Sequence, residues 1–202
     1  MHPKAVGEIR KMLKLNVLAL SLSVAAILAG AGVSGQSNAQ PEEFTATAIV
    51  NNNLGAGAGR VIVRVERWSS EAESGRLVEA LKKGPDSLLE ALRDMKSVGS
   101  IRTPDSLGYD LRYAHQDPGD EGGRHVIIAT DRPIGFWEAA NQPRVSNYPF
   151  TVVQMELDKN GEGKGTMSVA TKIILRHNTV ELENFATSPV MLNDIRAKAI
   201  KN

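Results

Sequence analysis

The order of strand and helix in this chain is decided between residues 60 and 81, which read RVIVRVERWSSEAESGRLVEAL. Apolar and polar residues alternate in the first part, a pattern typical of a strand with one buried face. The buried face is predicted to carry three valines, Val61, Val63 and Val65. The period changes at Ser70, because Ser followed three residues later by Glu73 is the capping box that begins a helix. A strand therefore gives way to a helix here.

The residues after this capping box predict two short helices that form a hairpin. The first has apolar residues at helical spacing, namely Leu77, Val78 and Leu81. It is expected to end at Gly84-Pro85, and Asp86 can cap the second helix. The apolar residues of the second helix follow the same spacing: Leu88, Leu89, Leu92 and Met95. We expect this helical hairpin to lie on a sheet.

Strands are predicted on both sides of the hairpin. Residues 44–50 form the first, and residues 51–59, with three Asn and then alternating Gly and Ala, predict a flexible connection to the second. Later strands are expected at 98–103, 107–114, 124–130, 150–158, 165–176, 179–185 and 190–196. Short polar turns separate several of them, which favours pairing of neighbours. The predicted fold class is α+β, mainly an antiparallel β-meander (sandwich or partial barrel) with a helical hairpin inserted after the second strand.

Residues 1–39 are predicted to be an export signal. Four basic residues and Glu8 come first, and an uncharged apolar stretch follows from Leu15 to Leu28. Small residues then precede a cleavage site between Ala39 and Gln40. The mature protein would be a single domain, residues 40–202, in the periplasm or outside the cell. Met12 is an alternative translation start, and an uncleaved membrane anchor is the alternative to cleavage.

Composition excludes several classes of protein. The chain has no cysteine, so disulfides, thiol nucleophiles, cysteine-bound metals and lipid attachment at a cysteine are excluded. Without residues 1–39, Lys and Arg fall from 24 to 20 and Asp and Glu from 23 to 22, a net charge of −2. A near-neutral domain without a basic run is not expected to bind nucleic acid.

An aromatic-rich loop is the first candidate for a binding site. Six of the nine aromatic residues fall between Tyr109 and Phe150. Residues 131–149 have no clear period, and long ordered loops in compact domains often bind ligands. The candidate ligand-binding residues are Tyr109, Tyr113, Arg132, Phe136, Trp137, Glu138, Arg144 and Tyr148. The alternative is that the aromatic side chains fold inward and complete the core.

A second candidate site surrounds the turn between residues 115 and 125. Histidines and aspartates gather there: His115, Asp117, Asp120 and His125. Imidazole and carboxylate groups could bind a metal or transfer protons. However, the spacing does not place the two histidines on one side of a single element, and the aspartates are typical of a solvated turn. No catalytic residue, metal ion or cofactor is therefore assigned.

Residues 158–163 match the first half of a calcium-binding loop. Oxygen-bearing side chains stand at positions 1, 3 and 5, and Gly163 stands at position 6. The glutamate that closes such a loop at position 12 is absent, since Val169 occupies that place. A tight turn between two strands explains the same residues.

Four stretches carry a resemblance to other proteins. They are Gly135-Phe-Trp-Glu138, Asn147-Tyr-Pro-Phe-Thr151, Gly161-Glu-Gly-Lys-Gly-Thr-Met167 and Val180-Glu-Leu-Glu-Asn-Phe185. In them the chain resembles a group of uncharacterised exported proteins of environmental bacteria. The resemblance covers most of the mature domain and implies export from a bacterial cell. It implies no activity, cofactor or catalytic residue.

Three kinds of function remain open at this point. The first is an exported, soluble binding or interaction domain without catalysis, whose partner is a small molecule or a protein of the cell envelope. The second is a hydrolase or metal-assisted enzyme at the 115–125 hairpin. The third is a structural envelope protein, which a large exposed apolar patch or open strand edges would favour.

Overall fold

The structure is a computed structural model that describes residues 40–53, 55–134, 147–177 and 179–200. These described residues belong to one compact unit, whose fold is given below. The expected signal, residues 1–39, lies outside the described residues, so the cleavage site is represented only by Gln40.

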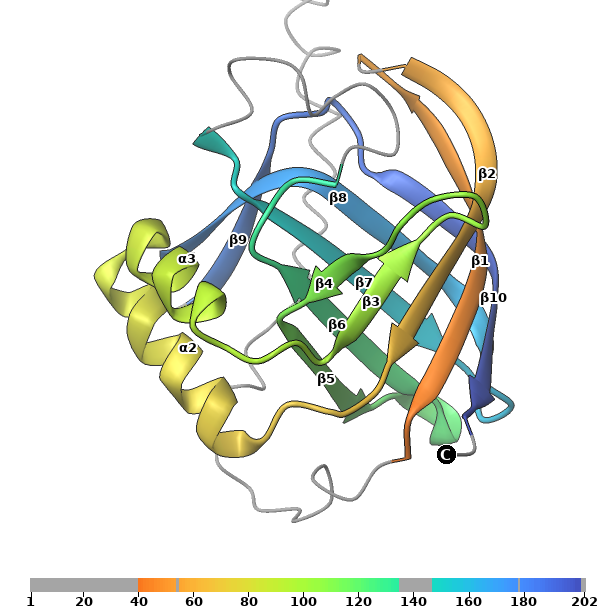
Figure 1. Cartoon of the computed structure of the whole chain (residues 1–202), viewed down its shortest axis with the longest axis horizontal. Coiled ribbons are helices and arrows are strands. Elements are labelled where there is room, and N and C mark those ends of the chain that lie inside the picture. Colours follow the sequence, from red (N-terminus) through yellow and green to blue (C-terminus); the bar gives the residue numbers. More distant parts are fainter. Residues whose placement is uncertain (1–39, 54, 135–146, 178, 201–202) are drawn as a thin grey trace, which may run out of the picture. The chain divides into compact units, whose positions relative to one another are not determined.

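The described residues of this unit form ten strands and two helices (Figure 1). The strands are β1 (Glu42–Asn52), β2 (Gly55–Val65), β3 (Gly99–Arg102), β4 (Tyr109–Leu111), β5 (Tyr113–Pro118), β6 (Arg124–Thr130), β7 (Phe150–Leu157), β8 (Glu162–Arg176), β9 (Thr179–Asn184) and β10 (Val190–Ala199). The helices are α2 (Glu71–Lys83) and α3 (Pro85–Arg93). A single 3₁₀ turn at Asp120–Gly122 joins β5 to β6.

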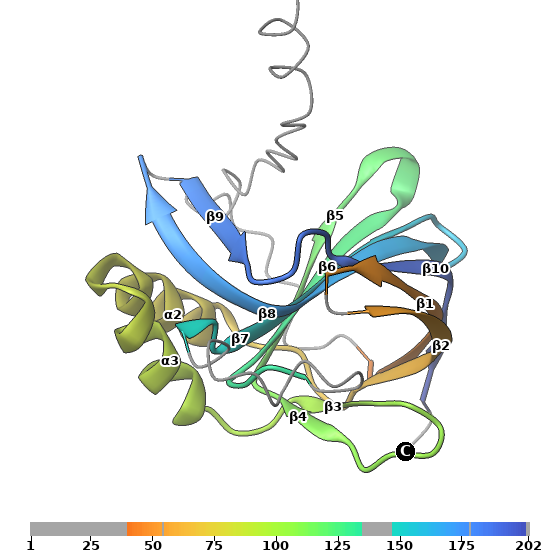
Figure 2. The same ribbon diagram turned by 90° about the horizontal axis from the view of Figure 1, so that it is seen from above.

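The strands form one antiparallel sheet that is nearly closed into a barrel. The order is β4-β3-β2-β1-β10-β8-β7-β6-β5, and β9 pairs with β8 alone. Only Arg112 separates β4 from β5, and its backbone N–H donates to the carbonyl oxygen of Ala129 at 3.0 Å. The two ends of the sheet therefore meet through one bent segment of chain, and Figure 2 shows the curvature. The predicted fold class is confirmed.

The inside of the barrel is filled with side chains. Buried residues from β1 to β10 form one apolar cluster, whose largest members include Phe44, Ile101, Leu111, Ile128, Met167, Leu192 and Ile195. Barrels of about eight strands are just wide enough for side chains to fill. At one end of β6, Arg124 forms a two-pronged ion pair with Glu42 at 2.8 and 3.0 Å, and its guanidinium lies 5.8 Å from the ring of Phe44.

The helical hairpin packs on the outside of the barrel, as predicted. Leu77 and Leu81 of α2 and Leu92 of α3 join a second buried cluster with Phe150 and Ile173. Figure 1 shows both helices beside the extended part of β8 and its partner β9. The hairpin therefore covers apolar side chains that the barrel cannot enclose.

The predicted capping box at Ser70 is present. The Ser70 hydroxyl accepts from the backbone N–H of Glu73 at 3.3 Å, and the Glu73 carboxylate accepts from the backbone N–H of Ser70 at 2.8 Å. Such a cap stabilises a helix by about 1 kcal/mol. Asp86 does not cap α3, because Gly84 occupies the cap position and Pro85 begins the helix.

The expected flexible connection over residues 51–59 is wrong. β1 and β2 pair in unbroken register from Glu42–Val65 to Asn52–Gly55, so the Gly-Ala run belongs to β2 and the first strand continues to Asn52. Glycine has no side chain and alanine has only a methyl group, so this run shows no alternation of apolar and polar residues. The backbone pairing with β1 decides the conformation here.

Candidate functional site

Two of the predicted binding residues, Tyr109 and Arg132, lie in one pocket at the rim of the barrel. This rim pocket has a volume of about 570 Å³. Its lining residues are Thr103, Ser106, Leu107, Gly108, Tyr109, Asp110 and Arg132. Most of them come from the turn between β3 and β4, whereas Arg132 follows the end of β6. Ligand pockets in proteins usually measure about 300–1,000 Å³.

The turn that forms one wall is held by its own hydrogen bonds. The backbone N–H of Thr103 donates to the Ser106 hydroxyl at 3.0 Å, and the backbone N–H of Ser106 donates to the Thr103 carbonyl at 3.3 Å. At Gly108 a side chain would press on Ser100, since a Cβ there would lie 3.2 Å from the Ser100 Cβ. Leu107 stands out from the turn with 93% of its surface exposed.

A chain of ion pairs supports the two charged residues of the rim pocket. Asp131 is only 6% exposed, and its carboxylate lies 3.5 Å from Arg132 Nε and 3.5 Å from Arg112 Nε. Arg112 in turn lies 3.6 Å from Asp110 and donates to the carbonyl oxygen of Met95 at 3.1 Å. Asp110 and Arg132 are thus linked by charge through the inner pair of Arg112 and Asp131, although neither Arg112 Nε nor Asp131 Oδ1 makes a hydrogen bond within the described residues.

Arg132 is the cationic side chain among the lining residues of the rim pocket. Its side chain is 56% exposed, and its Nε lies 3.5 Å from Asp131 Oδ1. A guanidinium presents five N–H donors in a planar fork that matches a carboxylate or phosphate. Tyr109 and Leu107 add apolar surface beside it. This combination suits a small molecule with an anionic group and an apolar body.

The remaining predicted binding residues do not join this pocket. Tyr113 lies under α2, where its hydroxyl is 3.1 Å from the Ser74 hydroxyl. Tyr148 contacts the β8–β9 extension, since its hydroxyl donates to Glu183 at 3.0 Å and its ring lies 4.9 Å from Lys172 Nζ. The other four lie outside the described residues: Phe136, Trp137, Glu138 and Arg144.

The structure brings His115 and Asp117 together. His115 Nε2 lies 3.0 Å from Asp117 Oδ1, and the ring of Tyr113 stacks on the imidazole with a centroid distance of 6.0 Å. Asp117 pairs directly with His125 across β5 and β6. Because residues two apart and directly paired residues share a face of a sheet, both histidines lie on the outer face. Within the described residues, no group of three His, Asp or Glu side chains could hold a metal ion.

Asp120 and His125 belong instead to a second cavity on the outside of the barrel. This outer groove measures about 680 Å³ and crosses β6, β7, β8 and β10. Its charged and polar lining residues are Asp120, Arg124, His125, Glu156, Asp158, Glu162, Lys164, Asn193 and Asp194. No local sequence pattern predicted Lys164, Glu156 or Asp194 as neighbours, because they come from three different strands.

The partial calcium-loop match is a turn between β7 and β8. Asp158 Oδ1 accepts from the backbone N–H of Asn160 at 2.8 Å and from that of Glu162 at 2.9 Å. The Glu162 N–H, followed by the Asn160 donors, holds the pKa of the Asp158 carboxyl below its usual value. The carboxylate is thus engaged by its own turn.

Comparison with protein-family models, curated proteins and solved structures found no match. Among the described helices, none has the length and apolar character needed to cross a membrane. Function therefore has to be inferred from the geometry of these sites.

Proposed function

We propose that the chain is an exported, non-enzymatic binding protein whose rim pocket takes a small molecule with an anionic group and an apolar body. The observation that carries this proposal is the position of Arg132, whose guanidinium is supported by the buried Asp131 and opens into a pocket beside Tyr109 and Leu107. Since the interior of the barrel is filled, a ligand on this fold is expected at the rim.

The lining of the rim pocket supports binding without catalysis. Its one serine, Ser106, accepts from the Thr103 N–H and lies 3.5 Å from the Thr103 carbonyl oxygen. No histidine is among the described lining residues, so Ser106 has no imidazole base there. Export and a bacterial source remain part of the proposal, on the composition of residues 1–39 and on the resemblance noted above.

Binding can be tested with benzoate, and with benzamide as its neutral counterpart of similar shape. We expect saturable binding of benzoate, followed by titration calorimetry or NMR, and weaker binding of benzamide. Arg132→Gln should weaken benzoate binding about tenfold or more, because a hydrogen bond to a charged group contributes about 1.5–3 kcal/mol.

Arg176→Gln is the matched control, since Arg176 is similarly exposed but pairs with Glu181 on the β8–β9 extension. This control should bind benzoate as the unchanged protein does. Equal binding of benzoate and benzamide, or no effect of Arg132→Gln, would count against an anion site in the rim pocket.

A hydrolase is the second candidate, favoured by the contact of 3.0 Å between His115 and Asp117. A carboxylate in this position orients an imidazole and stabilises its charged form. The candidate predicts turnover of p-nitrophenyl acetate that His115→Gln abolishes. If the purified protein and this variant hydrolyse the ester at the same rate, the dyad has no such role.

A further inference from the structure

The outer half of β2 has a free edge. β3 pairs with β2 only from Ile62 to Val65, whereas β1 pairs with β2 along its whole length. Among the described residues, 55–61 of β2 therefore have a strand partner on one side only. We call residues 55–61 the free edge of β2.

Three of the seven residues on this free edge direct their backbone groups away from β1. In a hairpin with a two-residue turn, the pair next to the turn exchanges both hydrogen bonds, and the pairs then alternate. Here the pair next to the turn is Asn52 and Gly55. Because the direction alternates along β2, the N–H and C=O groups of Ala56, Ala58 and Arg60 point away from β1. The contact from the N–H of Glu66 to Val98 at 2.8 Å, on the side of β3, agrees with this alternation.

Contact with the described molecule does not require glycine at Gly59, where an added Cβ would meet no atom within 4 Å. Gly55, beside the turn, has a φ of 150°, which residues with a side chain rarely adopt. Glycine within a strand costs about 0.5–1 kcal/mol relative to alanine, and it often marks a place where another backbone approaches closely. The Gly-Ala run thus leaves the outward N–H and C=O groups open to a second chain.

Charged side chains on an edge strand usually prevent it from pairing with another chain, and β9 is such a strand in this protein. β9 pairs only with β8, and it carries Glu181 and Glu183, which face Arg176 at 3.6 Å and Lys172 at 3.7 Å. The free edge of β2 carries a single charge, Arg60, at its inner end. One molecule therefore contains a protected edge and an unprotected one.

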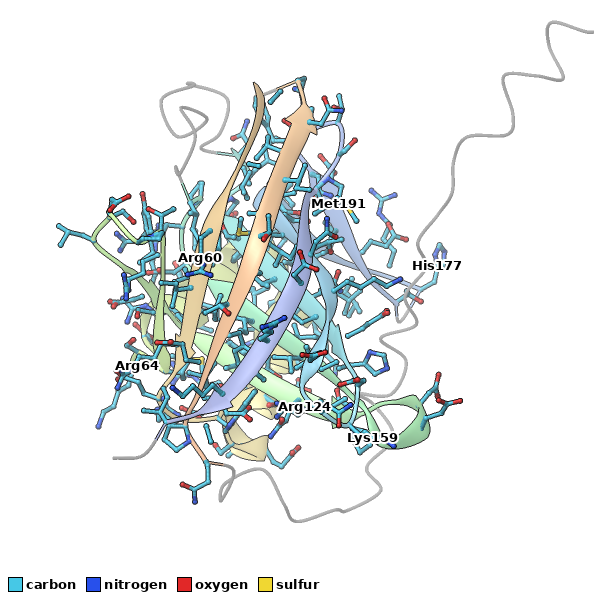
Figure 3. The ribbon with its side chains drawn as sticks, turned by 90° about the vertical axis from the view of Figure 1, so that its right-hand side faces the viewer. Arg60, Arg64, Arg124, Lys159, His177 and Met191 are labelled. Atoms are coloured by element: carbon cyan, nitrogen blue, oxygen red, sulfur yellow. The ribbon has the colours of Figure 1, made fainter. Side chains whose placement is uncertain are left out.

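An exposed apolar row leads to the free edge on the outer face of the sheet. Ile49 of β1 pairs with Ala58 on one side and with Met191 of β10 on the other. Ile49 and Met191 are 39% and 46% exposed, and both are among the exposed large apolar side chains of the described part. Figure 3 shows β2, β1 and β10 side by side, with Arg60 on β2 and Met191 on β10.

We propose that the free edge of β2 pairs with the same edge of a second copy of this chain, as an antiparallel ladder around a two-fold axis. With Ala58 opposite Ala58 of the second copy, Arg60 faces Ala56, so like charges do not meet. The two apolar rows then form one continuous stripe across both barrels. An unrelated peptide is less suited, because recognition by strand addition takes its specificity from side-chain pockets, and this edge offers Gly and Ala.

Sedimentation velocity of the protein purified after expression of the full chain tests the proposal. We expect a monomer–dimer equilibrium that shifts toward dimer as concentration rises. Ala58→Pro removes an outward N–H and should give a monomer, whereas Ala58→Val keeps the N–H and should still form dimers. Circular dichroism of each variant checks that the barrel is intact.

Met191→Lys provides a second variant that leaves every backbone donor in place. It puts a charge into the apolar stripe of both copies and should weaken the dimer without unfolding the barrel. A wild-type protein that sediments as a monomer at every concentration would overturn the proposal. So would a folded Ala58→Pro variant that dimerises as strongly as the wild type.

Discussion

Asp131 is a single buried residue on which the geometry of the rim pocket depends. Its carboxylate lies between Arg112 and Arg132, and Asp131→Asn would leave Arg112 with only the exposed Asp110 as an anionic neighbour. Removing one member of a buried ion pair typically costs about 3–5 kcal/mol. We expect a loss toward the lower end, roughly 3 kcal/mol, in the free energy of unfolding by urea.

Asp110→Asn is the control for that change. Its side chain is 57% exposed, and exposed ion pairs contribute about 0–1 kcal/mol. If both substitutions have the same small effect, the inner ion pair does not support the pocket.

Tyr113 is expected to ionise unusually late. Burial under α2 raises the pKa of its phenol to about 12, although the hydrogen bond with Ser74 acts in the opposite direction. In the unfolded chain the pKa of the same phenol is close to its ordinary value of 10.0. Since the folded pKa is the higher one, its contribution to stability is complete below pH 10 and is lost as pH rises toward 12.

Tyrosinate absorbance of the folded protein checks this expectation. The last step, near pH 12, should be missing in Tyr113→Phe. Tyr148 also ionises above its usual range, because its hydroxyl donates to Glu183, so its pKa step should remain in this variant. Tyr109→Phe is a control in which the step near pH 12 should persist. A step near pH 12 that survives in Tyr113→Phe would assign the raised pKa to another residue.

At the scale of elements, glycine has opposite roles in β8 and in α2. In β8 a Cβ at Gly163 would overlap the backbone carbonyl oxygen of Glu156, whereas at Gly75 in α2 it would meet no atom within 4 Å. Gly163→Ala should therefore destabilise the protein by roughly 1–3 kcal/mol. Gly75→Ala should stabilise it by about 0.5–1 kcal/mol, because glycine disfavours a helix interior.

Thermal and urea unfolding of the two variants measure this difference. Each glycine is the control for the other, since both substitutions add one methyl group. Equal shifts in the same direction would mean that β7 and β8 do not approach as closely at Gly163 as the structure shows.

The elements predicted best from sequence are those whose side chains alternate or recur. β6 was predicted with its observed bounds, Arg124–Thr130, and Ser70 with its capping box began α2 as expected. The Gly-Ala run in β2 escaped prediction, because its conformation comes from pairing with β1 and not from its own side chains. Pairing partners distant in sequence leave no local pattern.

The candidate site was predicted only in part, for a reason that also concerns pairing. Leu111 and Ala114 both face the interior, so the alternation slips by one residue at Arg112. This slip turns Tyr113 to the outer face, under α2, while Tyr109 stays at the rim. A slip of this kind depends on the closure of the barrel, which residue spacing cannot reveal.

At the scale of the whole molecule, the proposal of export makes a direct prediction about the N-terminus. The described domain begins its first strand at Glu42, three residues after Ala39. Cleavage after Ala39 would thus leave intact all ten strands of the described residues. Expression of the full chain in a Gram-negative host should give a periplasmic protein whose mass corresponds to a start at Gln40.

Two substitutions at Ala39 test the cleavage site in the same experiment. Ala39→Arg should block processing, because the residue before the cut must be small, whereas Ala39→Gly should be processed. A full-length protein that stays in the cytoplasm would contradict the proposed export.

The pairing of β1 with β10 has a kinetic consequence. Glu42 near the start of the domain pairs with Ala199 near its end, so the barrel closes only when nearly the whole domain is available. Contacts between such distant residues slow folding, because the entropy of closing a long loop is lost before the contacts can stabilise the chain. During synthesis β1 has no β10 to pair with, and the growing chain stays without its final closure. Such a delay would keep the polypeptide loose enough to be threaded through a narrow translocation channel before it folds.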